Sequence, residues 1–266
     1  MPLARGLPRM RAAAQRAVAL DNELSEGHVA LGIIALFFDW NWPEAERQLR
    51  RAIQLNPSDQ HAYHMYANYF LLMRRFDEAI ATRTRGVELD PLNARTSILL
   101  GHDYLAAGRY REAMHHSRRA VELDPANPLA LGLGPSPPYG PGEVFEAQGS
   151  YDDAVREYLD VARRRGATAA ELTELEAAYR SGGMRAFWRR WLGMEERQAA
   201  GTPDLVRIAK IWSRIGDTER AVEWLERAYG ARHPALIYLK VAPDLVRLHG
   251  DARVRQMLKD MQLLSS

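Results

Sequence analysis

The sequence has no cysteine and few lysines, since only Lys210, Lys240 and Lys259 of its 36 basic residues are lysine. The absence of cysteine excludes disulfide bonds, zinc–thiolate sites, iron–sulfur clusters and thiol nucleophiles. Long hydrophobic runs are also lacking: the longest, Val29 to Phe38, has ten residues and cannot span a bilayer. The first residues, MPLARGLPRMR, lack the apolar segment of a secretory signal. We therefore expect a cytoplasmic protein with no membrane partner.

Charge of one sign is not in excess either. Lys and Arg total 36 and Asp and Glu total 34, which leaves a formal net charge of +2. A chain with 47% hydrophobic and 26% charged residues is typical of a folded globular protein and not of a disordered one. Proteins that bind nucleic acid through bulk charge carry a strong basic surplus. The composition therefore indicates a folded protein that does not bind nucleic acid directly.

The sequence does contain an internal repeat with a constant interval, the repeat period. Three similar segments, RRAIQLNP, TRGVELDP and RRAVELDP, end at Pro57, Pro91 and Pro125. Two small residues, an aromatic residue and a large–small pair recur upstream of each proline. These positions are Ala52, Gly86 and Ala120; Ala45, Ala79 and Ala113; Trp42, Phe76 and Tyr110; and the pairs Leu31-Gly32, Tyr66-Ala67 and Leu100-Gly101. A fixed period equal to the interval in sequence from Pro57 to Pro91 is the signature of a repeat architecture.

Each repeat predicts two antiparallel helices. Small residues at the helix crossing let the two backbones approach, and the aromatic residue after the turn fills the gap between the helices. The proline near the end of each repeat stops the second helix, because it disfavours the helical conformation of the preceding residue. One helix pair alone exposes its apolar faces and is stable only when it stacks on neighbouring pairs. We therefore expect an all-α solenoid with an inner groove.

The repeat period, the Leu-Gly pair and the Leu-Asp-Pro endings resemble the tetratricopeptide repeat (TPR). The resemblance implies a right-handed superhelix of antiparallel helix pairs that binds a protein or peptide partner. The runs HVALGIIALFFDWNWPEAERQLRRAIQLNPSD and WLERAYGARHPALIYLKVAPDLVRLHGDARVRQML look like the TPR regions fused to bacterial winged-helix regulators, adenylate cyclases and Ser/Thr kinases. This likeness covers Glu23 to Leu264 apart from a proline-rich insertion, and it implies a bacterial partner-sensing or regulatory module of signalling or transcription. No effector motif of those proteins is present in the sequence.

Residues 1–166 are interpreted as an N-terminal TPR array with a half repeat, three full repeats and one interrupted repeat. The half repeat, Met10 to Asn22, matches a second helix whose first helix is absent. Its apolar face, Met10, Ala13, Ala17 and Leu20, would be bare. Because solenoids normally end in polar caps, a bare face predicts an upstream domain or a homo-oligomer formed through this helix. Alternatively, Met1 to Arg9 folds back as a crude cap.

The fourth repeat is interrupted by seven inserted residues. Gly149, Tyr151 and Ala154 follow Gly108, Tyr110 and Ala113 by one repeat period and seven further positions. The inserted stretch contains Pro135, Pro137, Pro138 and Pro141, which cannot lie inside a helix without losing hydrogen bonds. We expect a proline-rich loop at Gly134–Gly142 and one remaining helical turn at Glu143–Gln148. The loop is interpreted either as a groove lid or docking edge or as a tolerated surface insertion.

Residues 167–266 are expected to hold a divergent helix pair, a further TPR and C-terminal capping helices. The first helix of the pair should end at Gly182-Gly183, and Trp188 and Trp191 of the second helix should pack on the following repeat. Gly216, Thr218 and Ala221 follow Gly149, Tyr151 and Ala154 by one position less than two repeat periods. The divergent pair therefore fills one repeat slot. Stops are expected in the cap at Pro243 and Gly250.

The first helix of each repeat should line the groove with one residue in every three or four. This stripe comprises Glu26, Val29, Ile33 and Leu36 in the first repeat, His61, His64, Asn68 and Leu71 in the second, and Arg95, Ile98, His102 and Leu105 in the third. The centre of the groove is thus polar and weakly cationic, beside an apolar wall. The candidate ligand-binding residues are Val29, Ile33, His61, His64, Asn68, Leu71, Arg95, Ile98 and His102. The alternative is a merely solvated helix face.

Asparagine and basic side chains in the stripe could hold a peptide backbone or a terminal carboxylate through charge-assisted hydrogen bonds. Some TPR domains use such a carboxylate clamp, and the resemblance places Asn68 and Arg95 at comparable positions. Histidine stands where the clamp has lysine, so the match is partial. His61, His64 and His102 could approach one another around a metal ion, but Asp103, the nearest acidic residue, points off the stripe. We predict no metal site.

No catalytic residue and no cofactor is predicted. The sequence has no Gly-x-Ser-x-Gly elbow and no His-Glu-x-x-His pair. Glu195-Glu196 is assigned to an exposed helix end, Arg163-Arg164-Arg165 to a helix C-terminus, and His115-His116 to the outer surface. The sequence therefore favours a non-catalytic protein- or peptide-binding scaffold. The alternatives are a hydrolase-like enzyme with an unfamiliar groove site and a self-assembling structural scaffold.

Overall fold

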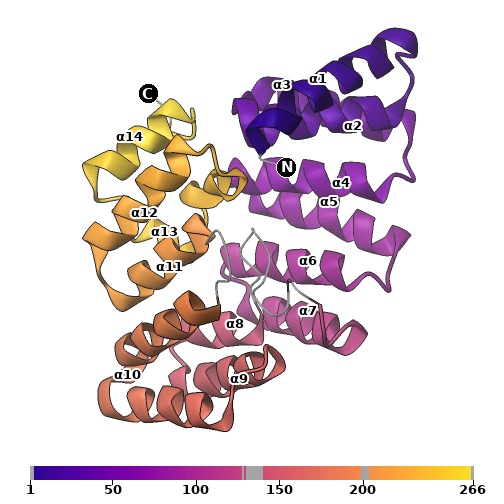
Figure 1. The fold of residues 1–266 in the computed structure, drawn as a ribbon. Coiled ribbons are helices and arrows are strands. Elements are labelled where there is room, and N and C mark those ends of the chain that lie inside the picture. The colour runs from indigo at the N-terminus through magenta and orange to yellow at the C-terminus, as the bar shows by residue number, and fades with distance from the viewer. Residues whose placement is uncertain (1–2, 128, 130–139, 199–203, 265–266) are drawn as a thin grey trace. The chain divides into compact units, whose positions relative to one another are not determined.

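The computed structural model describes residues 3–127, 129, 140–198 and 204–264. These residues form helices joined by short connections, with no β-strand among them, which confirms the all-α prediction (Figure 1). The chain divides into two compact units, Met1–Thr96 and Ser97–Ser266, and the boundary falls inside helix α6 (Ala94–Ala106). The division at residue 166, which separates regular from divergent repeats in the sequence, stays a prediction, as does the right-handed superhelical path.

The first unit holds the half repeat and the first two full repeats. Its elements are α1 (Leu3–Leu20), α2 (Ser25–Ile34), the π-helical η1 (Ala35–Asp39), α3 (Trp42–Leu55), α4 (Gln60–Leu72) and α5 (Phe76–Leu89), followed by the start of α6. Helix α2 packs on α3, and α4 packs on α5. Helices α3 and α5 begin one repeat period apart and also end one period apart, at Leu55 and Leu89. The predicted helix pairs and their prolines therefore mark equivalent corners.

Small residues form the helix crossings, as predicted. Ala45 and Ala79 are completely buried where α2 meets α3 and α4 meets α5. A Cβ atom placed on Gly32 would lie 2.7 Å from Cγ and Cδ2 of Leu49 on α3. Because atoms of this kind do not approach closer than about 3.5 Å without repulsion, α2 and α3 can be this close only with glycine at position 32.

The first repeat contains one residue more than the second between its helix-crossing positions. The step from Gly32 to Ala45 is longer by one position than the step from Ala67 to Ala79. The extra residue is accommodated in η1, a single π-helical segment at the end of α2, and Trp40 after it takes the left-handed conformation with φ 54° and ψ 34°. A π-bulge of this kind is how an α-helix accepts one inserted residue without breaking.

The half repeat is present as α1, which packs on α2. Met10 and Leu20 are exposed, as expected for a bare face, but Ala17 faces α2, where its Cβ would lie 3.7 Å from a Cβ on Gly27. The prediction of a bare face is therefore wrong for Ala17. From Leu3 onward the N-terminal residues continue α1, so they do not fold back as a cap.

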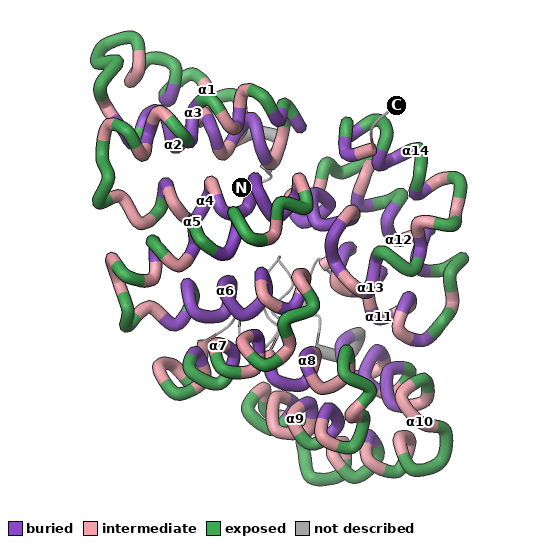
Figure 2. The backbone as a smooth tube through the Cα atoms, turned by 180° about the vertical axis from the view of Figure 1, so that it is seen from behind, coloured by how far each residue is buried: buried purple, intermediate pink, exposed green. Residues whose placement is uncertain are grey.

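The second unit contains the rest of α6 and the remaining elements. These are α7 (Tyr110–Leu123), α8 (Pro141–Ala147), α9 (Tyr151–Arg164), α10 (Ala169–Gln198), α11 (Leu205–Ile215), α12 (Thr218–Gly230), η2 (Pro234–Lys240), α13 (Pro243–Val246) and α14 (Ala252–Asp260). Helix α7 begins one repeat period after α5, and α9 begins one period and seven positions after α7, as the repeat pattern predicts. In Figure 2, α6 is mostly buried, whereas α1 of the first unit is mostly exposed.

The first helix of the fourth repeat starts earlier than expected. Helix α8 begins at Pro141 and not at Glu143, with Gly140 as its N-cap. Proline is well tolerated at the first helical position, because its missing N–H has no partner there in any helix. The carboxylate of Glu143 accepts a hydrogen bond from the backbone N–H of Gly140 at 3.0 Å, which fixes the helix start. Residues 134–139 of the predicted loop lie outside the described residues.

The divergent pair has the predicted break. Helix α10 is interrupted at Gly182 and Gly183, and Gly183 takes a positive φ of 62° that favours glycine. Beyond the break, Trp188 and Trp191 join a buried core with Tyr158 of α9 and with isoleucines of α11. The expectation that the two tryptophans pack on the following repeat is therefore confirmed, and they also pack on the preceding one.

Candidate functional site

Two exposed basic residues of the first unit lie close enough to His64 to affect its pKa. His61 lies in the first turn of α4, and Arg95 occupies the same repeat position, one period later, in the first turn of α6. Their neighbours connect the two turns, because the side-chain amide of Gln60 donates a hydrogen bond to the hydroxyl of Thr96 at 3.0 Å. Asp59 accepts a hydrogen bond from the backbone N–H of His61 at 2.9 Å and caps α4. These contacts hold both basic side chains at one exposed edge.

A buried arginine from α5 binds the next two polar residues of the stripe. Arg83 is fully buried; its guanidinium donates to the side-chain oxygen of Asn68 at 2.9 Å and to the backbone oxygen of His64 at 3.4 Å. It also lies 3.3 Å from Nδ1 of His64. An arginine can only donate, so Nδ1 of His64 is the acceptor and the imidazole carries its proton on Nε2. The structure therefore places His64 and Asn68 in the interior and not on an open helix face.

Burial and the positive charges around His64 keep its ring neutral. Burial lowers the pKa of His64 well below its ordinary value, and the nearby cations Arg83 and Arg95, followed by His61, lower the pKa further. With His64 neutral, the exposed basic side chains of this edge are those of His61 and Arg95.

The apolar candidates of the first unit belong mainly to its core. Val29 and Leu71 are buried, and Ile33 is half-buried. Their close packing explains the apolar part of the stripe without a ligand. Whether any of them also contacts a partner stays a prediction.

In the second unit, a C-terminal segment covers part of the stripe. Ile98 and His102 of α6 are buried, and the ring of Tyr238 from η2 meets the ring of His102 edge-on, with the ring centres 6.0 Å apart. Aromatic rings pack favourably in this T-shaped arrangement. The sequence interpretation did not anticipate that a segment so distant along the chain would lie on His102.

Sequence reasoning also missed a buried ionic cluster in the second unit. Arg214 of α11 binds Asp244 of α13 through two contacts, of 2.8 and 3.1 Å, and lies 3.8 Å from Glu143 and 3.7 Å from Glu146 of α8. The hydroxyl of Tyr158 donates to Glu146 at 2.7 Å. The cluster joins four helices that are far apart in sequence. Only the Gly140-x-x-Glu143 capping pattern gives a local signal for it.

Burial shifts the proton equilibria of this cluster. It raises the pKa of Glu143 to about 7, against the opposing effect of Arg214, and it lowers the pKa of Lys210 on α11 to about 8. Arg214 also lowers the pKa of Asp244, which outweighs the effect of burial on that carboxyl. At neutral pH the cluster therefore holds an ionised Asp244–Arg214 pair beside a Glu143 that is partly protonated.

Two surface assignments from the sequence are wrong. Glu195 is buried and not at an exposed helix end: it accepts from Arg165 at 2.5 Å, from Trp191 Nε1 at 3.0 Å, and pairs with Arg207 at 3.2 Å. Arg165, which caps the C-terminus of α9 as expected, is buried in this contact. The side chain of Glu196 lies outside what the structure describes. His115 is exposed as expected, but His116 is half-buried and stacks on the ring of Tyr104.

The described residues contain no group of three or more His, Asp or Glu side chains arranged to bind a metal ion. Among the same residues, every helix is too short or too polar to cross a bilayer.

Comparison with known proteins identifies the repeats. Two tetratricopeptide-repeat family models match adjacent stretches, residues 34–94 and residues 94–127. No curated protein sequence is significantly similar to the chain.

Solved structures share the fold at low sequence identity. PilF of Pseudomonas aeruginosa is 18% identical, with a TM-score of 0.52 over 90% of this chain and 98% of its own. The type IV pilus biogenesis factor PilW is 16% identical, with a TM-score of 0.50 over 85% of this chain and 98% of its own. The APC/C Cut9–Hcn1 hetero-tetramer contains a chain that is 15% identical, with a TM-score of 0.53 over 96% of this chain but only 46% of its own. At these identities the likeness concerns the fold alone.

Proposed function

Because the chain is a tetratricopeptide-repeat protein, a class that acts as protein-interaction scaffolds, we propose that it is a non-catalytic scaffold that binds a peptide segment of a partner through the first helices of its repeats. The observation that carries the proposal is the adjacent exposed pair His61 and Arg95, held at one edge by the Gln60–Thr96 hydrogen bond. A repeated basic residue on neighbouring helices offers two contact points to one extended chain.

The chemistry of this edge favours an anionic group on the peptide. Arg95 can bind a carboxylate with two parallel hydrogen bonds, and His61 can donate one more. Arg83 supports this edge from the interior, since its guanidinium binds Asn68 and His64. In this proposal His64 and Asn68 position Arg83, and the exposed pair contacts the ligand. Acidic side chains or a terminal carboxylate are therefore the preferred partners.

The remaining candidates take supporting roles in the proposal. Ile33, which is half-buried, would contact an apolar side chain of the peptide, whereas Val29 and Leu71 form the packed wall behind it. Ile98 and His102 belong to the second unit, where Tyr238 already contacts His102. Binding by these two residues would require the contact with Tyr238 to open.

We further propose that the partner is a component of bacterial signalling or transcription in the cytoplasm. Support for this comes from the sequence likeness to repeat regions of bacterial regulators and from the near-neutral charge, which does not favour nucleic acid. A second candidate function is self-assembly through α1, which is favoured by the 78% exposure of Leu20.

Selection of peptides from a random display library on the intact chain tests the peptide-binding proposal. We expect acidic peptides to be enriched, and the double variant His61→Gln/Arg95→Gln to bind a selected peptide at least tenfold more weakly in calorimetry. The matched control is His115→Gln/Arg118→Gln, which removes one exposed histidine and one exposed arginine from α7. Failure to select any peptide, or equal affinity of the double variant and the wild type, would contradict the proposal.

A further inference from the structure

Three arginines occupy the same position in the second helices of the three full repeats. Arg51, Arg85 and Arg119 follow one another at intervals of one repeat period. Three positions later, the second and third repeats carry a glutamate, and the side chains pair: Arg85 with Glu88 at 2.7 Å and Arg119 with Glu122 at 3.5 Å. Such pairs are the ordinary way in which an exposed helix balances its charges. The first repeat has Gln54 at the glutamate position.

Arg51 is therefore left without the partner that its counterparts have. Among the residues that the structure describes, no carboxylate pairs with Arg51 and no side chain or backbone group forms a hydrogen bond with it. The amide of Gln54 is neutral and cannot balance the guanidinium charge. Arg51 is nevertheless half-buried, so part of its side chain is held against the protein surface.

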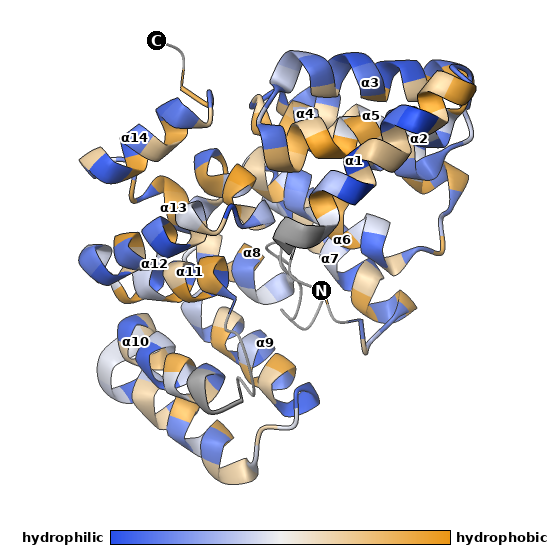
Figure 3. Ribbon diagram, turned by 45° about the horizontal axis from the view of Figure 1, so that its top comes forward, coloured by the Kyte–Doolittle hydropathy of each residue, from blue (hydrophilic) through white to orange (hydrophobic). Residues whose placement is uncertain are grey.

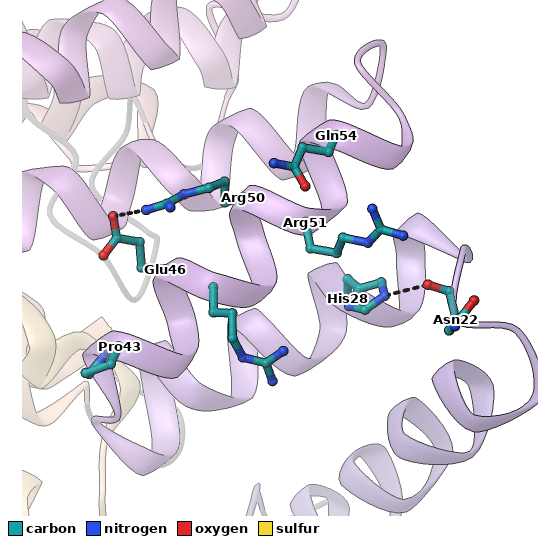
Figure 4. A pocket seen from close by; sticks show the side chains of 8 residues that line it. Asn22, His28, Pro43, Glu46, Arg50, Arg51 and Gln54 are labelled. Carbon is teal, nitrogen blue, oxygen red and sulfur yellow. Dashed lines mark hydrogen bonds and ion pairs between the residues drawn. The ribbon is translucent and has the colours of Figure 1, made fainter.

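This unbalanced arginine lines a pocket on the outer side of α3. The pocket has a volume of roughly 610 Å³ and is lined by Asn22, His28, Pro43, Glu46, Arg47, Arg50, Arg51 and Gln54 (Figure 4). In Figure 4 the side chain of Arg51 extends toward His28 and Asn22, that of Gln54 points the other way, and Arg50 extends toward Glu46. The ribbon of α3 is predominantly hydrophilic (Figure 3).

The end of the pocket near Arg51 is rich in unused hydrogen-bond donors. His28 is fixed by Gln48 at 2.6 Å and by the backbone oxygen of Asn22 at 3.0 Å. The side-chain amides of Asn22 and Gln54 are exposed and make no hydrogen bond within the described residues. The pocket lining thus offers a guanidinium and two amide groups to a ligand. This is the donor set that a carboxylate requires.

The other two arginines extend the positive charge along α3. Arg47 pairs with Glu44 at 2.7 Å and Arg50 pairs with Glu46 at 2.6 Å, all within the same helix. Exposed pairs of this kind contribute little to stability, so a ligand carboxylate can compete for these guanidinium groups at little cost. With Glu44 and Glu46 balancing Arg47 and Arg50, the Arg51 guanidinium carries the surplus positive charge of the pocket.

We propose that this pocket is a second binding site, which takes an acidic segment of a partner protein with one carboxylate on Arg51. The lining of α3 extends from Pro43 to Gln54, which corresponds to about 16 Å at ~1.5 Å per residue. An extended peptide advances about 3.3 Å per residue, so roughly five residues cover this length. The site lies on the second helix of its repeat and does not depend on the proposed groove function.

The second and third repeats show how the equivalent arginine is arranged on a helix surface without such a pocket. Where the same arginine serves only solubility, it is paired within its own helix, as Arg85 and Arg119 are. Replacement of Gln54 by glutamate reproduces that arrangement with a side chain of the same size. The variant Gln54→Glu should therefore fold normally and close the site by pairing with Arg51.

Fluorescence anisotropy with a fluorescein-labelled pentaglutamate peptide tests the proposal on the full chain. We expect the wild type to bind this probe and a labelled pentalysine peptide not to bind. Gln54→Glu and Arg51→Gln should each weaken pentaglutamate binding about tenfold. The controls Arg85→Gln and Arg119→Gln, which remove the same side chain from sister repeats, should leave the affinity unchanged. Because the proposed groove also favours acidic groups, the assay is repeated in the His61→Gln/Arg95→Gln background. Gln54→Glu should still weaken pentaglutamate binding about tenfold there, which separates this site from the groove.

Three results would overturn the proposal. The first is an absence of pentaglutamate binding by the wild type. The second is equal affinity of the wild type and Gln54→Glu, because the restored ion pair must compete with the ligand. The third is competition by inorganic phosphate at concentrations far below those of unlabelled pentaglutamate, which would identify the pocket as a phosphate site and not as a peptide site.

Discussion

Asp244 and Arg214 form a buried ion pair that joins the short helix α13 to α11. The guanidinium binds both carboxylate oxygens, at 2.8 and 3.1 Å, and its carbon lies 4.3 Å from the centre of the Trp188 ring. The side chains of Asp244 and Arg214 are 6% and 9% exposed. Because α13 is a single turn and cannot hold itself by helix formation, this pair fixes its position.

Replacement of Asp244 by alanine should strongly destabilise the second unit. The change leaves the buried Arg214 without its closest carboxylate, and removal of one partner of a buried pair costs about 3–5 kcal/mol. Urea denaturation followed by circular dichroism measures the loss. The control is Glu219→Gln, which breaks the exposed contact with Arg253 and should cost much less. Equal losses for the two variants would show that the Asp244 pair has no special role.

The pH dependence of stability should carry the signature of Glu143. Its folded pKa is about 7, above the ordinary 4.5, so the folded chain binds a proton that the unfolded chain has released. The stabilisation from this proton is complete below pH 4.5 and is lost as the pH rises through 7. Relative to Glu143→Gln, the wild type should lose at most about 3 kcal/mol over this window, at ~1.36 kcal/mol per pKa unit. Denaturation series at several pH values, compared between the two proteins, measure this; a constant difference contradicts it.

Two glycine-to-alanine changes should act in opposite directions. At Gly32 the new methyl group would lie 2.7 Å from Leu49, which is fully buried and cannot move away, so a loss of about 1–3 kcal/mol is expected. At Gly86 the nearest atom would be Cβ of Tyr63 at 3.5 Å, an ordinary contact. Gly86→Ala should stabilise the protein by roughly 0.5–1 kcal/mol, because alanine has less freedom to lose on folding. Thermal melts of both variants test the pair, and stabilisation by Gly32→Ala would show that the crossing is looser than described.

Self-association through α1 should depend on its exposed apolar side chains. Leu20 and Met10 are 78% and 37% exposed, so a second copy could bury them. If this surface associates, the mass measured by light scattering grows with concentration, and Leu20→Lys/Met10→Lys abolishes the growth. Leu92→Lys, at another apolar side chain that is 71% exposed, serves as the control. A wild-type mass that is independent of concentration would exclude association through α1 in the range studied.

The repeat positions allow the helices to be predicted because they report local packing. Trp42, Phe76 and Tyr110 begin α3, α5 and α7, each directly after a turn, and the prolines stop these helices two positions after their ends. The same periodicity places His61 and Arg95 at equivalent positions of the predicted stripe. The spacing of the repeated residues is thus enough to predict where each helix of a repeat begins and ends.

Contacts between distant elements could not be predicted in the same way. The pattern of α4 shows that His64 and Asn68 share a face, but only the structure shows that Arg83 fills the space between them. The Arg214 cluster draws on α8, α9, α11 and α13, which no common spacing relates. The sequence shows glutamine at position 54, where the second and third repeats have glutamate. Only the structure shows that this position lies in a pocket beside Arg51.

The π-helical segment η1 (Ala35–Asp39) has a consequence for the evolution of repeat arrays. The additional residue is retained within one helix, and α3 still meets α2 at Ala45 and ends one repeat period before α5. An insertion is therefore not transmitted to later repeats. Lineages of this protein can gain or lose a single residue near the end of a first helix while every downstream hairpin keeps its phase.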